Sequence, residues 1–204
     1  MKTCSNTSRS KCKPVLILLF FILLSVAVFL TYRFLTGNAA EKRNHPILFE
    51  NEVERYAERF EVPKEIVYAV ILTESSFDPS AVSSADAKGL MQLTDDTNEY
   101  VTAYLLKEEI TEGDLFDPET NIRRGTCLLG YLYGRFGNWE TAYAAYNAGI
   151  GRVLGWLSDP AYSSDGEHLD KIPFEETDRY VRKVARAAES YRKLYFADES
   201  ETQN

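Results

Sequence analysis

One carboxylate, Glu74, lies in a setting where it can do acid chemistry. It follows the apolar run 66–72, which is predicted to be helical, and it precedes the polar segment 75–80 (SSFDPS). A general acid keeps its proton near neutral pH only when it is partly shielded from water, and the end of a buried helix offers that shielding. Two later segments, 89–93 (GLMQL) and 145–149 (AYNAG), supply amide and aromatic side chains of the kind that bind sugar rings. Together these features predict a site that cleaves a carbohydrate.

The elements that must position these residues read as helices. Apolar side chains recur at the spacing of a helix face along most of the chain after residue 48. This spacing predicts helices near 49–60, 63–74, 90–106, 118–133, 139–147, 151–157 and 180–195. Pro63 is expected as a first helical residue and Asn138 as a helix N-cap, while 77–88 and 158–172 are expected as loops. Since no segment shows the alternation of a strand, the predicted fold class is all-α, of a small globular type.

Charge divides the chain into two parts of opposite sign. The chain has 204 residues and a net charge of −8, of which residues 2–43 carry about +6 and residues 44–204 about −14. Phosphate binding needs a basic face, so the acidic part argues against nucleic acid as a partner and against lipid headgroups as a substrate. About 160 residues in that part suit one domain with a sizeable core.

The basic N-terminal part contains a long apolar run from Pro14 to Leu35, interrupted by Ser25, Thr31 and Arg33. A helix of that length reaches roughly 30 Å, enough to cross a bilayer, and the lysines and arginines before it favour a cytoplasmic N-terminus. We therefore expect a single-pass protein of the cell membrane with its globular domain outside the cytoplasm. The expected segments are a cytoplasmic N-terminus at 1–13, a transmembrane anchor at 14–36, a linker at 37–46, the domain at 47–196 and a polar tail at 197–204. A signal peptide cleaved near 37–39 is the alternative.

Cysteines and histidines predict neither a disulfide nor a metal site in the outer domain. Cys127 is the single cysteine after residue 43 and is expected to be a small buried hydrophobe. His45 and His168 have no ligand-like neighbours in the sequence, so neither a metal nor a cofactor is predicted.

Four segments in order resemble the lytic transglycosylases of glycoside hydrolase family 23, of the soluble lytic transglycosylase type, which are related in fold to goose-type lysozyme. The segments are 74–83 (ESSFDPSAVS), 87–93 (AKGLMQL), 145–149 (AYNAG) and 172–181 (IPFEETDRYV), and 117–122 (DPETNI) resembles the family's linking segment. The resemblance spans roughly residues 48–195. It implies a lysozyme-like catalytic domain at 47–196 that acts on the glycan strands of peptidoglycan.

The resemblance also implies a reaction and a set of site residues. Glu74 matches the family's acid/base, which cleaves the β-1,4 bond between N-acetylmuramic acid and N-acetylglucosamine and leaves a 1,6-anhydro end. Substrate contacts are implied for Ser83, Met91, Gln92, Tyr146, Asn147 and Tyr180. Structural roles stay open for several of these, in particular a turn before Gly149 for Asn147 and a core position for Tyr180. The chain departs from the family pattern at Asp86, Thr94 and Asp95, which leaves the shape of the glycan groove open.

Two other functions fit the same residues. A hydrolytic muramidase would use water in place of the internal nucleophile, and a non-catalytic scaffold would bind the wall without cutting it. Beyond the glycan strand and the membrane, coupling to cell-wall synthesis or to other envelope machinery is compatible with an anchored enzyme, and the sequence does not choose a partner.

Overall fold

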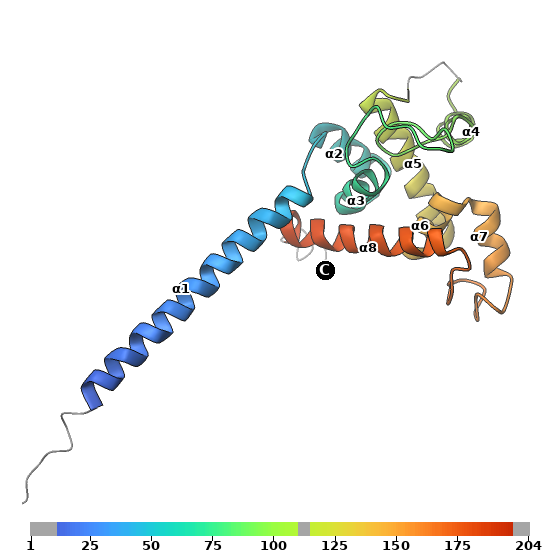
Figure 1. Ribbon diagram of the computed structural model, residues 1–204. Coiled ribbons are helices and arrows are strands. Elements are labelled where there is room, and N and C mark those ends of the chain that lie inside the picture. Colours follow the sequence, from blue (N-terminus) through green and yellow to red (C-terminus); the bar gives the residue numbers. More distant parts are fainter. Residues whose placement is uncertain (1–11, 110–114, 198–204) are drawn as a thin grey trace, which may run out of the picture. The chain divides into compact units, whose positions relative to one another are not determined.

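The computed structural model describes residues 12–109 and 115–197, and it divides the chain into two compact units, 1–46 and 47–204. Every regular element in the described residues is a helix, as Figure 1 shows. The described backbone has two isolated β-bridges, Val82 to Lys88 and Lys88 to Leu93, and both lie in one loop. The all-α prediction is therefore confirmed.

The described part of the first unit is a single helix, α1 (Cys12–Asn44). It contains the whole apolar run, and its described apolar side chains, such as Phe20, Leu23 and Phe29, are exposed. Across the described side chains, which within α1 leave out 12–16, 18, 19, 34–36 and 38, no helix is both long and apolar enough to cross a membrane. The expected anchor at 14–36 thus stays a prediction.

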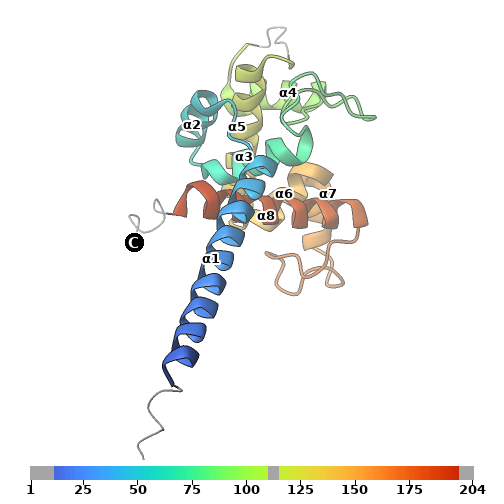
Figure 2. The same ribbon diagram turned by 60° about the vertical axis from the view of Figure 1, so that its left-hand side comes forward.

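The second unit contains the remaining described helices, which Figure 2 shows from a second direction. They are α2 (Glu50–Arg59), α3 (Lys64–Glu74), α4 (Asp95–Tyr100), the π-helix η1 (Val101–Leu106), α5 (Pro118–Phe136), α6 (Trp139–Ala148), α7 (Ile150–Leu157) and α8 (Glu175–Tyr195). Six of the seven predicted helices have counterparts within a few residues of their expected bounds. Pro63 is the N-cap of α3 rather than its first residue.

Side-chain caps explain where two of these helices begin. The carboxylate of Asp117 accepts a hydrogen bond from the backbone N–H of Thr120 at 2.8 Å, and Pro118 then fills the first position of α5. The side-chain oxygen of Asn138 accepts from the N–H of Thr141 at 3.0 Å, which confirms Asn138 as the N-cap of α6. Each cap satisfies a backbone donor that the first turn of a helix leaves unpaired.

The core is built around α3. All residues from Ile66 to Ile71 are buried, and α3 packs along α8, where the ring of Tyr191 stacks on that of Tyr68. The helix α6 lies against both α5 and α8. Cys127 of α5 is buried and unoxidised, and burial raises the pKa of its thiol to about 11, which confirms the expected buried hydrophobe. A helix buried on all sides can hold the carboxyl at its end in one place.

The predicted helix over 90–106 is wrong in its first part. Gly89 and Gln92 have left-handed backbone angles, with φ of 74° and 49°, so the chain makes a tight turn where a helix was expected. The helix α4 starts only at Asp95, because the hydroxyl of Thr94 accepts from the N–H of Thr97 at 3.2 Å and caps it. From Val101 the helix continues with π geometry to Leu106.

Candidate active site

Glu74 is the last residue of α3, and the residue keeps part of its surface exposed while its carboxyl is largely buried. The phenol of Tyr180, which comes from α8 and lies 106 residues later in the chain, donates a hydrogen bond to Oε1 of Glu74 at 2.7 Å. Tyr180 is 9% exposed, so this bond forms in surroundings from which most water is excluded. The carboxyl is therefore oriented by protein and still within reach of solvent.

Burial changes the acidity of Glu74. Loss of hydration disfavours the charged carboxylate and raises the pKa of Glu74 to about 7, although the hydrogen bond from Tyr180 and the charge of Lys183 oppose the rise. A group with a pKa near 7 can give up a proton and take one back at neutral pH. The groups of the described chain that shift this pKa are a phenol and an ammonium, and neither is a second carboxylate.

The loop that follows Glu74 is closed by hydrogen bonds from its own polar side chains. The hydroxyl of Ser75 donates to the carbonyl of Leu90 at 2.8 Å. The hydroxyl oxygen of Ser83 accepts from two backbone N–H groups, at 3.2 and 3.1 Å, and the amide of Gln92 donates to two loop carbonyls, at 3.0 and 2.8 Å. Ser83 and Gln92 therefore shape the loop, and their contacts with substrate stay predictions.

Met91 differs from its predicted role. Its side chain is completely buried, so it has no surface with which to touch a substrate. Its main chain serves the site instead, because its carbonyl accepts a hydrogen bond from the phenol of Tyr146 at 2.8 Å. Burial and the charge of Glu74 both raise the pKa of Tyr146, which shows that this phenol and the carboxyl lie in the same electrostatic environment.

Asn147 and Tyr180 come from the two helices that frame the carboxyl. Asn147 is exposed near the end of α6, and its side-chain oxygen accepts from the hydroxyl of Thr177 in α8 at 2.8 Å. This bond ties α6 to the first turn of α8, so Asn147 has a structural partner in addition to its predicted substrate contact. The hydrogen bonds of Tyr180 and Thr177 thus link α8 to the end of α3 and to the end of α6.

Sequence reasoning missed Asn121, which is fully buried in α5. Its amide donates to the carbonyls of Lys88 and Leu115 at 2.9 and 2.8 Å, and its oxygen accepts from the N–H of Met91 at 2.7 Å. Asn121 therefore fixes the loop that carries Met91. An amide on the apolar face of a predicted helix, inside the family's linking segment, was the available signal.

The departures from the family pattern also build this loop. Thr94 caps α4, and the ammonium of Lys88 binds the carboxylates of Asp86 at 3.4 Å and Asp95 at 2.7 Å. The ion pairs are largely exposed and contribute little energy. The carboxylates of Asp86 and Asp95 are both exposed, so these two departures add negative charge to the surface of the loop.

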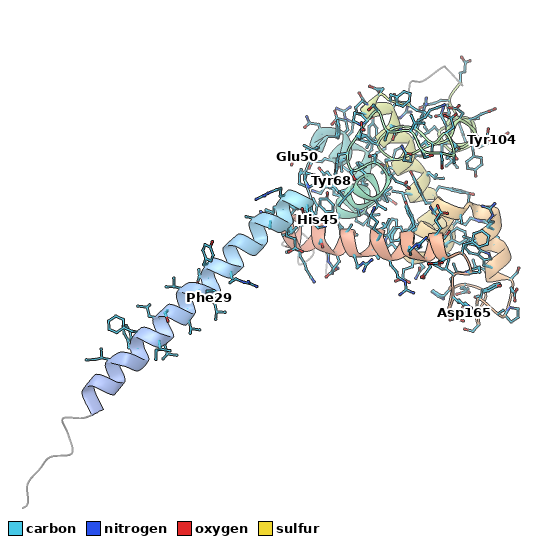
Figure 3. The ribbon with its side chains drawn as sticks, in the orientation of Figure 1. Phe29, His45, Glu50, Tyr68, Tyr104 and Asp165 are labelled. Atoms are coloured by element: carbon cyan, nitrogen blue, oxygen red, sulfur yellow. The ribbon has the colours of Figure 1, made fainter. Side chains whose placement is uncertain are left out.

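Tyr104 and His168 are both exposed. Tyr104 in η1 is 70% exposed and, as Figure 3 shows, lies at the outer part of the α4 region. His168 forms an ion pair with Asp165 at 2.7 Å in the loop before α8. No group of three or more His, Cys, Asp or Glu side chains among residues 12–109 and 115–197 is placed to hold a metal ion.

Comparison with known proteins shows which family the chain resembles. Residues 51–168 match the family described as Transglycosylase SLT domain. The soluble lytic murein transglycosylase of Escherichia coli K12 is 36% identical over 156 residues, which cover 75% of this chain and 24% of that protein. The membrane-bound lytic murein transglycosylase C of Edwardsiella ictaluri is 34% identical over 182 residues, which cover 78% of this chain and 50% of that protein. The chain thus spans about a quarter to a half of the length of these relatives.

Solved structures agree with the sequence comparisons. The 70 kDa soluble lytic transglycosylase of Escherichia coli superposes with a TM-score of 0.66 at 33% identity, over 76% of this chain and 26% of that one. An inactive glutamate-to-glutamine mutant of the lytic transglycosylase Slt of Pseudomonas aeruginosa superposes with a TM-score of 0.63 at 32% identity, over 74% of this chain and 25% of that one. Since the family match covers more than half of its residues, this chain belongs to the transglycosylase SLT domain family.

Proposed function

We propose that this protein is a peptidoglycan lytic transglycosylase with Glu74 as its single acid/base. The observation that carries the proposal is a largely buried carboxyl with a pKa raised to about 7, oriented by Tyr180, in a domain of the transglycosylase SLT family. The activity named for the relatives belongs to proteins two to four times longer than the matched region, so its transfer to this chain is part of the proposal.

The proposed reaction uses one carboxyl twice. Protonated Glu74 donates its proton to the oxygen of the β-1,4 bond between N-acetylmuramic acid and N-acetylglucosamine, and the bond from that oxygen to C1 breaks. The resulting carboxylate accepts the proton of the C6 hydroxyl of the same muramic residue, whose oxygen bonds to C1. The product is a 1,6-anhydro end, no water is consumed, and Glu74 is again protonated. A hydrolysis by two carboxylates would need a second acid across the scissile bond, whereas the proposed reaction needs Glu74 alone.

Residues around the carboxyl would bind the sugars. Tyr146 offers an aromatic ring, and the charge of Glu74 acts on its phenol. Asn147, the next residue of α6, offers an exposed amide. Ser83 and Gln92 would contact acetamido and hydroxyl groups from the loop that they already hold in shape, and Met91 would support that loop from beneath. Tyr180 would act mainly by orienting Glu74.

The proposal predicts that Glu74→Gln removes turnover and preserves binding. Loss of the general acid lowers the rate by about 10²- to 10⁴-fold, while glutamine retains an oxygen that can accept from Tyr180. Release of soluble muropeptides from purified sacculi measures the rate, and sedimentation with sacculi measures binding. Glu99→Gln, at an exposed position of α4, is the matched control. Turnover by Glu74→Gln at the rate of the unchanged chain would contradict the proposal.

Mass spectrometry of the released muropeptides separates the two alternative functions from the proposed one. Anhydro products are lighter by one water than products with a reducing end. Products with reducing ends alone would make the protein a hydrolytic muramidase. Binding to sacculi without any released product, across a range of pH, would make it a wall-binding scaffold.

We propose that α1 anchors the enzyme in the cell membrane, with the N-terminus in the cytoplasm and the domain outside it. Support comes from the apolar run Pro14–Leu35 and the basic residues before it. A membrane-bound relative carries this domain in a protein of about twice the matched length. An anchored domain would meet glycan strands close to the membrane, where the wall is made, and this geometry favours coupling to wall synthesis or other envelope machinery.

A further inference from the structure

Two side chains of α8 contact the last turn of α3. Besides the bond from Tyr180 to Glu74, the ammonium of Lys183 donates to the backbone carbonyl of Thr73 at 3.2 Å. Residues three apart on a helix project from the same face, so both contacts come from one side of α8. They end on neighbouring residues, one on the side chain of Glu74 and the other on the main chain just before it.

The contact of Lys183 completes the end of α3. Helix ends leave their last carbonyls without helical donors, and a cation near them is favourable. The carbonyls of Ile71 and Leu72 accept from the N–H groups of Ser75 and Ser76, at 3.1 and 3.2 Å. The next carbonyl along the chain is that of Thr73, and the donor that the structure gives it is Lys183.

We propose that Lys183 is a positioning residue for Glu74, which fixes the main chain beneath the carboxyl and places a positive charge beside it. The inference rests on the proposed function of Glu74 as the acid/base. Lys183 lies outside the four segments that resemble the family, two residues after the end of the last one. Its side chain is exposed, so the contact is a bridge across the surface between α8 and α3 rather than part of the core.

The charge of Lys183 has a defined effect on ionisation. It favours the carboxylate form and lowers the pKa of Glu74, as does the hydrogen bond from Tyr180, while burial raises it. Tyr146 of α6 is a further titratable group in this environment, and the charge of Glu74 raises its pKa in turn; Tyr143 of α6 acts on Tyr180. Activity that requires protonated Glu74 falls as pH rises through that pKa. Removal of Lys183 therefore moves the alkaline limb of the pH profile to higher pH.

The test compares Lys183→Met with Lys183→Arg and with Arg182→Met in the full chain in a nonionic detergent. Methionine keeps the length and the apolar stem of lysine without its charge, and arginine keeps a cationic donor. Arg182 is the matched control, because its guanidinium pairs with Asp178 of the same helix at 3.0 Å. One readout is the ¹³C NMR titration of the Glu74 carboxyl, assigned by its absence in Glu74→Gln. The other is the pH profile of muropeptide release.

We expect Glu74 of Lys183→Met to titrate at higher pH than in the unchanged chain, and Lys183→Arg and Arg182→Met to titrate as the unchanged chain does. We expect kcat of Lys183→Met at the original optimum to fall about three- to tenfold with KM little changed, because a displaced acid weakens the chemical step more than binding. Equal titration of Glu74 in Lys183→Met and Arg182→Met would overturn the inference. If Lys183→Met does not fold, Lys183→Gln, which lacks the charge but keeps a polar donor, decides by the same titration.

The NMR readout needs no turnover, so the two proposals can fail separately. A chain that releases no muropeptides, yet shows the expected change in titration, would overturn the proposed function and leave the effect of Lys183 on the ionisation of Glu74 established. A chain that releases anhydro products, with the titration of Glu74 unaffected by Lys183→Met, would support the proposed function and overturn the role of Lys183.

Discussion

At the scale of single residues, the ionisation of Glu74 links the site to the stability of the domain. In an unfolded chain the carboxyl has a pKa near 4.5, and in the folded protein burial raises it to about 7. The folded state therefore binds the proton more tightly than the unfolded state. The stability that this gives is fully present below pH 4.5 and is lost as pH rises through about 7. The site keeps its acid protonated at the expense of stability in alkaline solution.

Glu74→Gln should therefore stabilise the protein at pH 8 and change it little at pH 5. A shift from 4.5 to about 7 corresponds to about 3 kcal/mol at most. For a chain of this size that amounts to a rise in Tm of roughly 5–10 °C. Thermal unfolding followed by circular dichroism at both pH values measures the difference. Glu99→Gln, at an exposed position, should show the same small effect at both, and so would Glu74→Gln if its carboxyl were well hydrated.

Sequence reasoning found the residues of the site that lie in recognisable segments. Glu74, Tyr146 and Tyr180 were predicted, and the structure brings them into one electrostatic environment. Lys183 and Asn121 were not, because each acts through a contact between distant parts of the chain. Lys183 reaches a carbonyl 110 residues earlier, and Asn121 reaches a loop about 30 residues earlier. Periodicity and local motifs carry no information about such pairs.

At the scale of elements, the loop between α3 and α4 decides where the site residues point. Its geometry depends on Gly89, which has φ of 74° and passes close to α5. A helical pattern over 90–106 competes with this turn in the sequence, and the turn wins because Asn121 binds the main chain of the loop on both sides of Leu90. Tertiary hydrogen bonds of this kind override local propensity, so the true start of α4 was visible only in the structure.

Gly89→Ala should therefore destabilise the domain and lower its activity. A Cβ at this position would lie 2.1 Å from the carbonyl oxygen of Leu115 and 2.4 Å from the amide nitrogen of Asn121, and the backbone angle adds strain. We expect a loss of about 3 kcal/mol in the free energy of unfolding, measured by urea denaturation. Gly134→Ala is the matched control. Gly134 lies within α5 with open space around it, and alanine there should stabilise by about 0.5–1 kcal/mol. Equal effects of the two substitutions would show that Gly89 has no special role.

At the scale of the whole molecule, opposite charges and different surfaces separate the two units. Residues 2–43 carry about +6 and residues 44–204 about −14. The large apolar side chains described along α1 are exposed, whereas the second unit has a buried core that includes Ile71 and Leu129. The exposed leucine and phenylalanine side chains of α1, with the basic residues before them, are the features on which the proposed membrane anchor rests. The proposed anchor thus depends on the distribution of charge and apolar surface over the whole chain.

Replacement of both Leu23 and Val26 by arginine should release the protein from membranes. These positions lie near the middle of the run Pro14–Leu35, where each arginine costs about 2.5–3.5 kcal/mol in a bilayer. We expect the unchanged chain to remain in the membrane pellet after alkaline carbonate extraction and the double variant to move to the supernatant. Gly37→Arg with Ala40→Arg, in the expected linker, adds the same charge outside the run and should stay in the pellet. An unchanged chain that appears in the supernatant at full length would contradict the anchor, and one that appears there shortened near residues 37–39 would identify the run as a cleaved signal peptide.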